Sequence, residues 1–243
     1  EENITYLFVP WHEFEYQHIQ AIRTKLIETA SPATANRYLS ALRRVLKEAW
    51  RLGYISAEKY HRLVDVQSIK GERLPTGREL TKSEINALVA NCVEDQTISG
   101  IRDAAIIALM YAGGLRRDEI VLVDNYDSQT GKLIITGKGN KQRTVYINDG
   151  VADALEDWLT IRGDSSGYLF FAINKGDNIR YGKKLSPQAI YGILSKRAES
   201  ANVKKFSPHD LRRTFISELL DAGADITTVA KMAGHSSVNT TAR

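Results

Sequence analysis

Cysteine is nearly absent from this sequence, which holds one such residue, Cys92, among 243. A single cysteine excludes an internal disulfide framework and fits a reducing compartment, so we expect Cys92 to be a buried small side chain. Long hydrophobic runs are missing too. The longest apolar stretch, Ala104 to Leu115, is flanked by charged residues and is shorter than the about 20 residues that a membrane span needs. The sequence therefore predicts a buried helix at this stretch, in a cytoplasmic protein with no membrane partner.

Metal and nucleotide motifs are also lacking. The first three of the five histidines, His12, His18 and His61, show no metal-ligand spacing such as HExxH. The phosphate-binding pattern GxxxxGK[ST] does not occur either. We therefore expect neither a metal site nor a bound cofactor.

Hydrophobic residues make up 43% of the chain, enough for one large domain or two ordinary ones. The formal net charge is +4. A moderate positive excess fits an anionic partner but is also common in proteins that have none. The positions of the basic residues therefore matter more than their number.

The first 66 residues are predicted to form a small helical unit, with helices at Trp11 to Ile27, after Ser31-Pro32, and at Ala57 to Val66. A hydroxyl cap followed by proline is a typical helix start, and Gly53 marks the end of the second helix. One face of this helix is apolar and the opposite face is basic. The basic face carries Arg37, Arg44, Lys47 and Arg51. Two interpretations stay open for it: a DNA-binding surface or an ordinary solvated one.

A change of pattern follows at residues 67–79, where glycine, proline and basic residues indicate an exposed linker. Thr81 and Glu84 then form a capping box that begins a new helix. Further helices are predicted from about Gly100 to Tyr111, at "RRDEIVLV", and over everything after Ser186. The strands "KLIIT" and "RTVYI" flank the basic tip "GKGNKQ" of a hairpin, and "GYLFFA" is a further strand. The predicted fold is mostly α with a small antiparallel β-sheet.

The segment "SPHDLRR" places His209 and Arg212 as neighbours on one face, close to the N-terminus of a helix. Free backbone N–H groups, a guanidinium and an imidazole all favour a phosphate there. In "GGLRRDEI" a flexible turn precedes Arg116, and Glu119 is placed to hold that arginine. Lys138 lies at the hairpin tip, where a lysine can donate a proton. Each of these signals alone is more often ordinary protein surface.

Their order along the chain is more informative. The chain carries, in this order, GLRxxE, GKGxKxR in a hairpin, PHxLR, and GHSS after an apolar helix. With this order of motifs the sequence resembles the tyrosine recombinase (phage integrase) family over essentially the whole chain. The resemblance implies that Arg116, Lys138, His209, Arg212 and His235 surround a scissile DNA phosphate, with Glu119 in support. It also implies a two-domain clamp. The core-binding domain would be residues 1–66, the linker 67–79 and the α+β catalytic domain 80–243. The expected DNA contacts are Arg37, Arg44, Lys47, Arg51, Lys141 and Arg143.

The resemblance further implies a site-specific recombinase that cuts and rejoins duplex DNA through a 3′-phosphotyrosyl intermediate, without ATP or metal. Measured from His235, the family's tyrosine falls directly after Arg243, so the sequence as given is not expected to cleave. We expect a homotetramer on two DNA sites, and a monomer or weak oligomer without DNA. Two alternatives remain. One is a non-catalytic DNA-binding or directionality protein with the same fold, and the other is a type IB topoisomerase.

Overall fold

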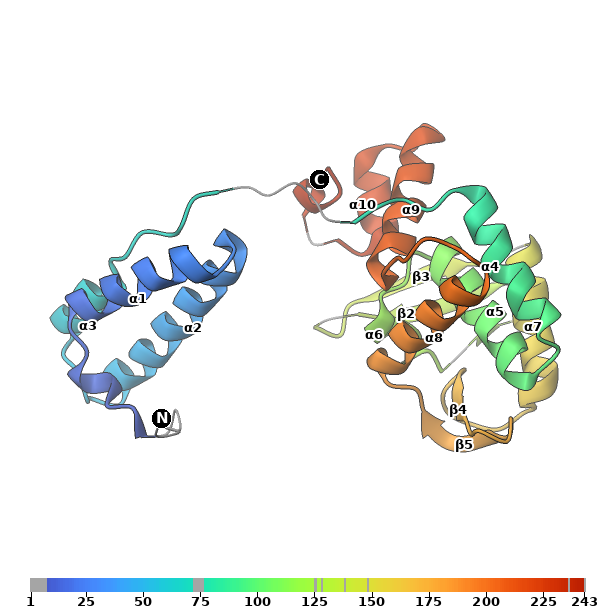
Figure 1. Ribbon diagram of the computed structural model, residues 1–243, viewed down its shortest axis with the longest axis horizontal. Helices are drawn as coiled ribbons and strands as arrows, with labels where there is room; N and C mark the ends of the chain where they lie inside the picture. The colour runs from blue at the N-terminus through green and yellow to red at the C-terminus, as the bar shows by residue number, and fades with distance from the viewer. Residues whose placement is uncertain are drawn as a thin grey trace. The chain divides into compact units, whose positions relative to one another are not determined.

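The computed structural model describes residues 8–71, 77–124, 126–127, 129–137, 139–147, 149–235 and 237–242. The chain forms two compact units, Glu1–Pro75 and Thr76–Arg243, each with its own core (Figure 1). The division falls inside the segment that the sequence predicts to be a linker. Within the ranges described, no helix combines the length and the apolar content needed to cross a membrane.

In its described residues the first unit packs three α-helices after a short 3-10 turn. These elements are η2 (Trp11–Glu13), α1 (Tyr16–Thr29), α2 (Pro32–Arg51) and α3 (Ala57–Val64). Ser31 caps α2 as predicted, since its hydroxyl accepts a hydrogen bond from the backbone of Thr34 at 3.3 Å. The predicted helix from Trp11 to Ile27 is wrong at its start, because the 3-10 turn ends at Glu13 and α1 begins only at Tyr16. The core of this unit comprises Ile19, Leu46, Ala49, Ile55, Leu63 and Val66.

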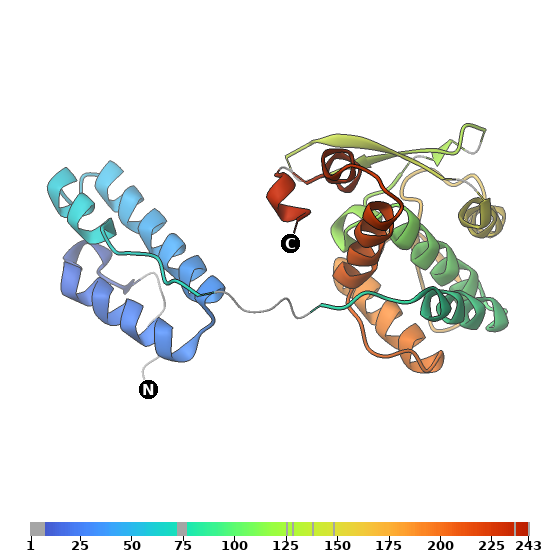
Figure 2. The same ribbon diagram turned by 90° about the horizontal axis from the view of Figure 1, so that it is seen from above.

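The second unit is mostly helical, as Figure 2 shows, and its described residues form two small antiparallel sheets. Its helices are α4 (Lys82–Glu94), α5 (Ile98–Ala112), α6 (Arg117–Ile120), α7 (Asp149–Arg162), α8 (Pro187–Ser200), α9 (Pro208–Asp221), α10 (Ile226–Ala233) and the 3-10 turn η3 (Val238–Thr240). One sheet has the order β1 (Tyr126–Asp127), β2 (Lys132–Thr136), β3 (Gln142–Tyr146), and the other pairs β4 (Phe171–Ile173) with β5 (Ile179–Lys184). The predicted fold class is therefore confirmed.

Helix α5 forms the centre of the second unit and contacts α4, α7 and α9. All its residues from Arg102 to Met110 are buried, which confirms the buried helix expected from the apolar stretch. Cys92 is buried on the neighbouring α4, also as expected. The capping box of Thr81 and Glu84 is present at the start of α4. A buried central helix gives the surrounding elements a fixed frame on which the site is built.

Several elements differ from the sequence-based expectation. Helix α7 and strand β5 were not predicted, and the strand expected at "GYLFFA" begins only at Phe171. The helix expected at "RRDEIVLV" ends at Ile120 after four residues. Beyond it Val121 and Val123 are buried outside any helix, and the Val123 carbonyl accepts a hydrogen bond from Leu169 at 2.7 Å. Tertiary packing of these valines overrides the helical pattern.

Candidate active site

The turn between α5 and α6 presents the first site residue, Arg116. Gly114 in this turn has φ +55°, and a Cβ there would lie 2.3 Å from Cδ1 of Phe215, so glycine is required on both counts. Arg116 is the N-cap residue of α6, and its Nη1 donates to Glu119 Oε1 at 2.7 Å. Its Nη2 donates to the Gly234 carbonyl at 3.2 Å. The side chain stays 38% exposed, so it is fixed in place but still accessible.

Glu119 is the carboxylate at the centre of the site, with 4% of its surface exposed. Arg143 on β3 binds it with both terminal nitrogens, Nη1 to Oε1 at 3.0 Å and Nη2 to Oε2 at 2.8 Å. Burial of the carboxylate favours its neutral form, but the hydrogen bonds from Arg143 and Arg116 outweigh it and lower the pKa of Glu119 to about 2. Glu119 is therefore charged at neutral pH and orients both arginines.

Arg212 on α9 lies deepest in the site, with 1% of its surface exposed. Its Nη1 donates to the Gly114 carbonyl at 2.6 Å and its Nη2 donates to the Ala233 carbonyl. Among the described residues its Nε has no hydrogen-bond partner. Burial and the positive charge of Arg116 lower the pKa of Arg212 to about 9. A buried guanidinium with a free donor and no carboxylate of its own is suited to bind an anion.

His209 belongs to the first turn of α9, which Ser207 and Asp210 cap reciprocally. The side chain is exposed at the helix N-terminus, where free backbone N–H groups favour an anion. Partial desolvation and the positive charges of Arg212 and Arg213 lower the pKa of His209. Its imidazole is therefore held toward the neutral form, which can accept a proton at neutral pH.

His235 follows the end of α10, where Gly234 takes the left-handed conformation at φ +65°. A Cβ at Gly234 would lie 3.2 Å from Nη1 of Arg143, so this turn packs closely on the arginine cluster. The Nδ1 of His235 is hydrogen-bonded to Oγ1 of Thr241 at 2.8 Å, which fixes the ring. Burial and the charges of Arg212 and Arg116 lower the pKa of His235 to about 4.

The structure thus brings four of the five predicted catalytic residues together, along with the supporting Glu119. Arg116 contacts the residue next to His235, and the charges of Arg116 and Arg212 both act on the two histidines. The fifth, Lys138, lies outside the described residues. The residue before it, Gly137, would place a Cβ 3.4 Å from Oε1 of Glu119. The base of the β2–β3 hairpin therefore reaches the same site.

The electrostatic balance of the site is positive. Among the described residues Arg116, Arg143 and Arg212 surround the Glu119 carboxylate, so three guanidinium groups share this one acid while the histidines are neutral. In the part of the chain that is described, no group of three or more His, Cys, Asp or Glu is placed to hold a metal ion. What this arrangement can do chemically is bind a phosphate-like anion and exchange protons with it through neutral imidazoles.

The residues predicted to contact DNA have different environments. On α2 the side chains of Arg37, Arg44 and Lys47 are exposed, whereas Arg51 is paired with Glu48 at 2.9 Å. Lys141 is exposed beside the hairpin tip.

Arg143, which was also expected to contact DNA, instead binds Glu119 and has a side chain only 12% exposed. Alternation along β3 gives the signal that was missed, because Arg143 and Val145 share one face and Val145 packs on the core. Thr241, the partner of His235, was missed as well, and no pattern in the sequence distinguishes it.

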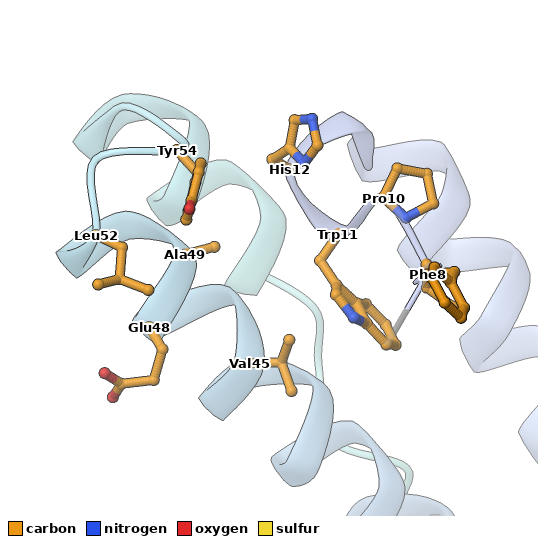
Figure 3. A pocket seen from close by; sticks show the side chains of 10 residues that line it. Phe8, Pro10, Trp11, His12, Val45, Glu48, Ala49, Leu52 and Tyr54 are labelled. Atoms are coloured by element: carbon orange, nitrogen blue, oxygen red, sulfur yellow. The ribbon is translucent and has the colours of Figure 1, made fainter. Parts of the chain in front are cut away.

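A separate pocket lies in the first unit, between the 3-10 turn and the end of α2 (Figure 3). Aromatic and aliphatic side chains such as Trp11, Val45 and Leu52 form most of its lining. Among the described lining residues the titratable side chains are those of His12, Glu48 and Tyr54. It lacks the arginine cluster described above, so the pocket offers no comparable anion site.

Comparison with known proteins agrees with this geometry. Residues 78–243 match the phage integrase family. The tyrosine recombinase XerD of Lacticaseibacillus casei is 33% identical over 232 residues, covering 92% of this chain and 75% of the relative. The tyrosine recombinase XerC of Corynebacterium efficiens is 32% identical, covering 94% of this chain and 72% of the relative.

Solved structures share the fold at lower identity. The crystal structure of the XerH site-specific recombinase bound to a palindromic difH substrate superposes with a TM-score of 0.72 at 20% identity, covering 95% of this chain and 66% of that one. The XerA recombinase superposes with a TM-score of 0.58, also at 20% identity, covering 95% of this chain and 78% of that one. The profile match and the two relatives show that this chain belongs to the phage integrase family, among the tyrosine recombinases.

Proposed function

We propose that the protein is a site-specific DNA recombinase that cuts and rejoins duplex DNA through a 3′-phosphotyrosyl intermediate. The observation that carries this proposal is the convergence of Arg116, His209, Arg212 and His235 in one positively charged site. Simple duplex binding does not need such a cluster. The XerH neighbour was solved with its DNA substrate, and membership of the tyrosine recombinase family supports the same activity for this chain.

Arg116 and Arg212 are proposed to stabilise the transition state. Attack on a phosphodiester places growing negative charge on the nonbridging oxygens, and donors that bind this charge more strongly than the ground state accelerate the reaction. Arg116 offers an accessible guanidinium held by Glu119, and Arg212 offers the unpaired Nε. Arg143 keeps Glu119 in position rather than contacting the phosphate itself.

The two histidines, His209 and His235, have different roles in this proposal. If the hydroxyl of Thr241 donates to Nδ1 of His235, the Nε2–H of the ring is left to donate to a phosphate oxygen. The lowered pKa keeps that ring neutral. His209, exposed at the start of α9, would accept or return the proton of the nucleophile.

The nucleophile is proposed to be a tyrosine at the position directly after Arg243. Its phenolic oxygen would attack the phosphorus and form a phosphotyrosyl bond, while the bond from phosphorus to the 5′ oxygen breaks. Lys138 would give the leaving oxygen its proton. Because the phosphotyrosyl bond conserves the energy of the phosphodiester, the reverse reaction rejoins DNA without ATP.

Duplex binding is proposed to involve the exposed basic face of α2, with Arg37, Arg44 and Lys47, together with Lys141 of the hairpin. These side chains would contact phosphates, which position the protein on DNA without reading its sequence. Residues 1–66 would form the core-binding domain and residues 80–243 the catalytic domain, closed around the duplex as a clamp. Two DNA sites would assemble with four copies of the chain.

The test is formation of a covalent protein–DNA adduct on a nicked suicide substrate, with protein that extends through the position after Arg243. Arg116→Ala and Arg212→Ala are each expected to lower the adduct rate roughly a hundredfold or more, because each removes a transition-state donor. The matched control is Arg117→Ala, an exposed neighbour with no partner among the described residues. It is expected to form adducts at the wild-type rate.

Duplex affinity is measured on the same variants, with circular dichroism to show that they fold. Adducts that form equally well with Arg116→Ala and Arg212→Ala would contradict the proposed roles. Wild-type protein that binds duplex DNA but never forms an adduct would favour the non-catalytic alternative. Strand exchange between two DNA molecules separates a recombinase from a topoisomerase, which would only relax supercoils.

A further inference from the structure

Residues 77–80, which we name the strap, lead from the division between the two units into α4, and they run along α9 (Figure 1). Gly77 accepts a hydrogen bond at its carbonyl oxygen from Nη1 of Arg213 at 2.9 Å. Arg78 donates its backbone N–H to Oδ1 of Asp210 at 3.0 Å. The strap thus meets α9 at its first turns, next to His209 and Arg212.

The second half of the strap continues these contacts. Glu79 accepts a hydrogen bond from the hydroxyl of Ser217 at 2.6 Å. Leu80 donates its backbone N–H to the hydroxyl of Thr214 at 2.9 Å, in a buried position. Each strap residue therefore bonds α9, and the contacts extend over about two turns of that helix. A single bond of this kind would be ordinary packing, but a continuous series fixes both the rotation and the position of the helix.

Asp210 is the residue through which the strap reaches the site. It is 6% exposed, and its Oδ2 accepts from the backbone N–H and the hydroxyl of Ser207, each at 2.8 Å. Its Oδ1 takes the bond from the strap. A Cβ on Gly77 would lie 2.4 Å from that same oxygen. The strap can approach this closely only because residue 77 has no side chain.

The side chain of Arg78 ties the strap to the loop before α9. Its guanidinium donates to the carbonyl oxygens of Lys204 and Lys205, and its Nη1 contacts Oε2 of Glu84 at 2.9 Å. Glu84 is the N3 residue of the capping box at the start of α4. Arg78 therefore joins the start of α4, the strap and the approach to α9 in one hydrogen-bonded group.

We propose that the strap is a positioning segment, which holds the first turn of α9 so that His209 and Arg212 meet the scissile phosphate. This inference rests on the proposed function, because it takes the roles of these two residues as given there. None of the strap residues contacts the phosphate in this proposal.

The test is Gly77→Ala in the full-length protein, with Gly192→Ala as the matched control. Gly192 lies in α8 with nothing within 4 Å of an added Cβ, so the same change there meets no neighbour. Gly77→Ala is expected to slow single-turnover cleavage of the suicide substrate roughly ten- to a hundredfold, because small displacements of catalytic groups are costly. The dissociation constant for duplex DNA is expected to stay within about twofold, since the basic surfaces are unchanged.

A second readout separates positioning from stability. The pKa of His209 is lowered by partial desolvation and by the charge of Arg212, and Gly77→Ala changes no charge. If the first turn of α9 moves, NMR titration of the folded protein is expected to show the His209 ring returning toward its ordinary pKa.

If Gly77→Ala does not fold, Arg78→Met tests the inference about the strap, with Lys82→Met as its control. Lys82 is exposed at the start of α4, so this control removes the same charge nearby. Arg78→Met is expected to slow cleavage and to move the His209 titration in the same direction. If folded strap variants cleave at the wild-type rate while Arg212→Ala does not cleave, the inference about the strap is overturned and the proposed function is not. If Arg212→Ala also cleaves normally, the proposed function fails and the inference fails with it.

Discussion

The protonation state of each histidine in the site is set by its neighbours. His235 is partly buried and faces the positive charges of Arg212 and Arg116. The neutral ring is therefore favoured in the folded protein. The carboxylate nearest the site, Glu119, is already bound by two arginines. A neutral histidine in such surroundings can donate a hydrogen bond to an anion without adding charge to an already positive site.

This environment predicts a stability change at mildly acidic pH. The pKa of His235 falls from its ordinary 6.5 to about 4 on folding. As the pH falls below 6.5, His235 is protonated in the unfolded chain but stays neutral in the folded chain. The free energy of unfolding therefore decreases until the pH reaches the pKa of the folded state. Between about pH 7 and pH 5 the contribution of His235 is expected to fall by up to about 2 kcal/mol. His235→Asn is expected to lack this part of the loss.

Urea unfolding of the wild type and the variant at both pH values measures the difference. The control is His61→Asn, at an exposed position of the other unit, which should keep the full pH dependence of the second unit. The carboxyl group of Glu119 does not interfere, because its pKa lies near 2 and its ordinary value lies below this pH window. Equal pH dependence in the wild type and in His235→Asn would contradict the expected contribution.

At the scale of elements, sequence signals with a local physical cause were the ones that could be predicted. The caps at Ser31 and Thr81 and the β-rich runs of the β2–β3 hairpin depend on a few adjacent residues, and each is present. Helix α7 and strand β5 could not be predicted in the same way. Strand β5 is exposed along most of its length and contains a glycine, so it lacks the alternating apolar pattern.

The site was predictable in part for the same reason. The helix start that carries His209 and Arg212 has a local signature, and the structure shows its cap. The bond between Arg143 and Glu119 joins positions 24 residues apart, and the contact of His235 with Thr241 has no pattern that reveals it. Such pairings depend on how distant elements pack, so no rule about neighbouring residues can supply them.

The turn between α5 and α6 gives a prediction at this scale. Gly114→Ala places a methyl group against the Phe215 ring and also strains a backbone at φ +55°. Gly163 has φ +67°, and a Cβ added there would have nothing within 4 Å. Gly163→Ala therefore measures the backbone strain without a steric contact. Gly163→Ala is expected to cost about 1 kcal/mol of unfolding free energy, and Gly114→Ala about 1 to 3 kcal/mol more. Urea denaturation measures both. Equal losses would show that contact with Phe215 does not constrain the turn.

The whole molecule combines two units with separate cores, and the proposed tasks divide between them. The cluster of arginines and histidines lies entirely in the second unit, on α6, β3, α9 and the end of α10. The exposed basic face of α2 lies in the first. A substitution that destabilises one unit should therefore affect DNA binding and DNA cleavage to different extents, because each core is stabilised by its own contacts.

Salt dependence tests this division through the first unit. Replacing Arg44 and Lys47 together by glutamine removes two exposed charges from the basic face of α2. If both side chains contact phosphates, fewer counterions are released on binding, and the slope of log affinity against log salt is expected to fall by about two.

The control double variant, Lys25→Gln with Arg62→Gln, removes the same net charge from side chains that are paired with Glu28 and Glu58. It is expected to change the affinity slightly and to keep the wild-type slope, because a general loss of charge is not a loss of contacts. Fluorescence titration of a labelled duplex over a series of salt concentrations gives both slopes. Two double variants with the same slope as the wild type would mean that the face of α2 is ordinary solvated surface, and that duplex affinity arises elsewhere in the chain.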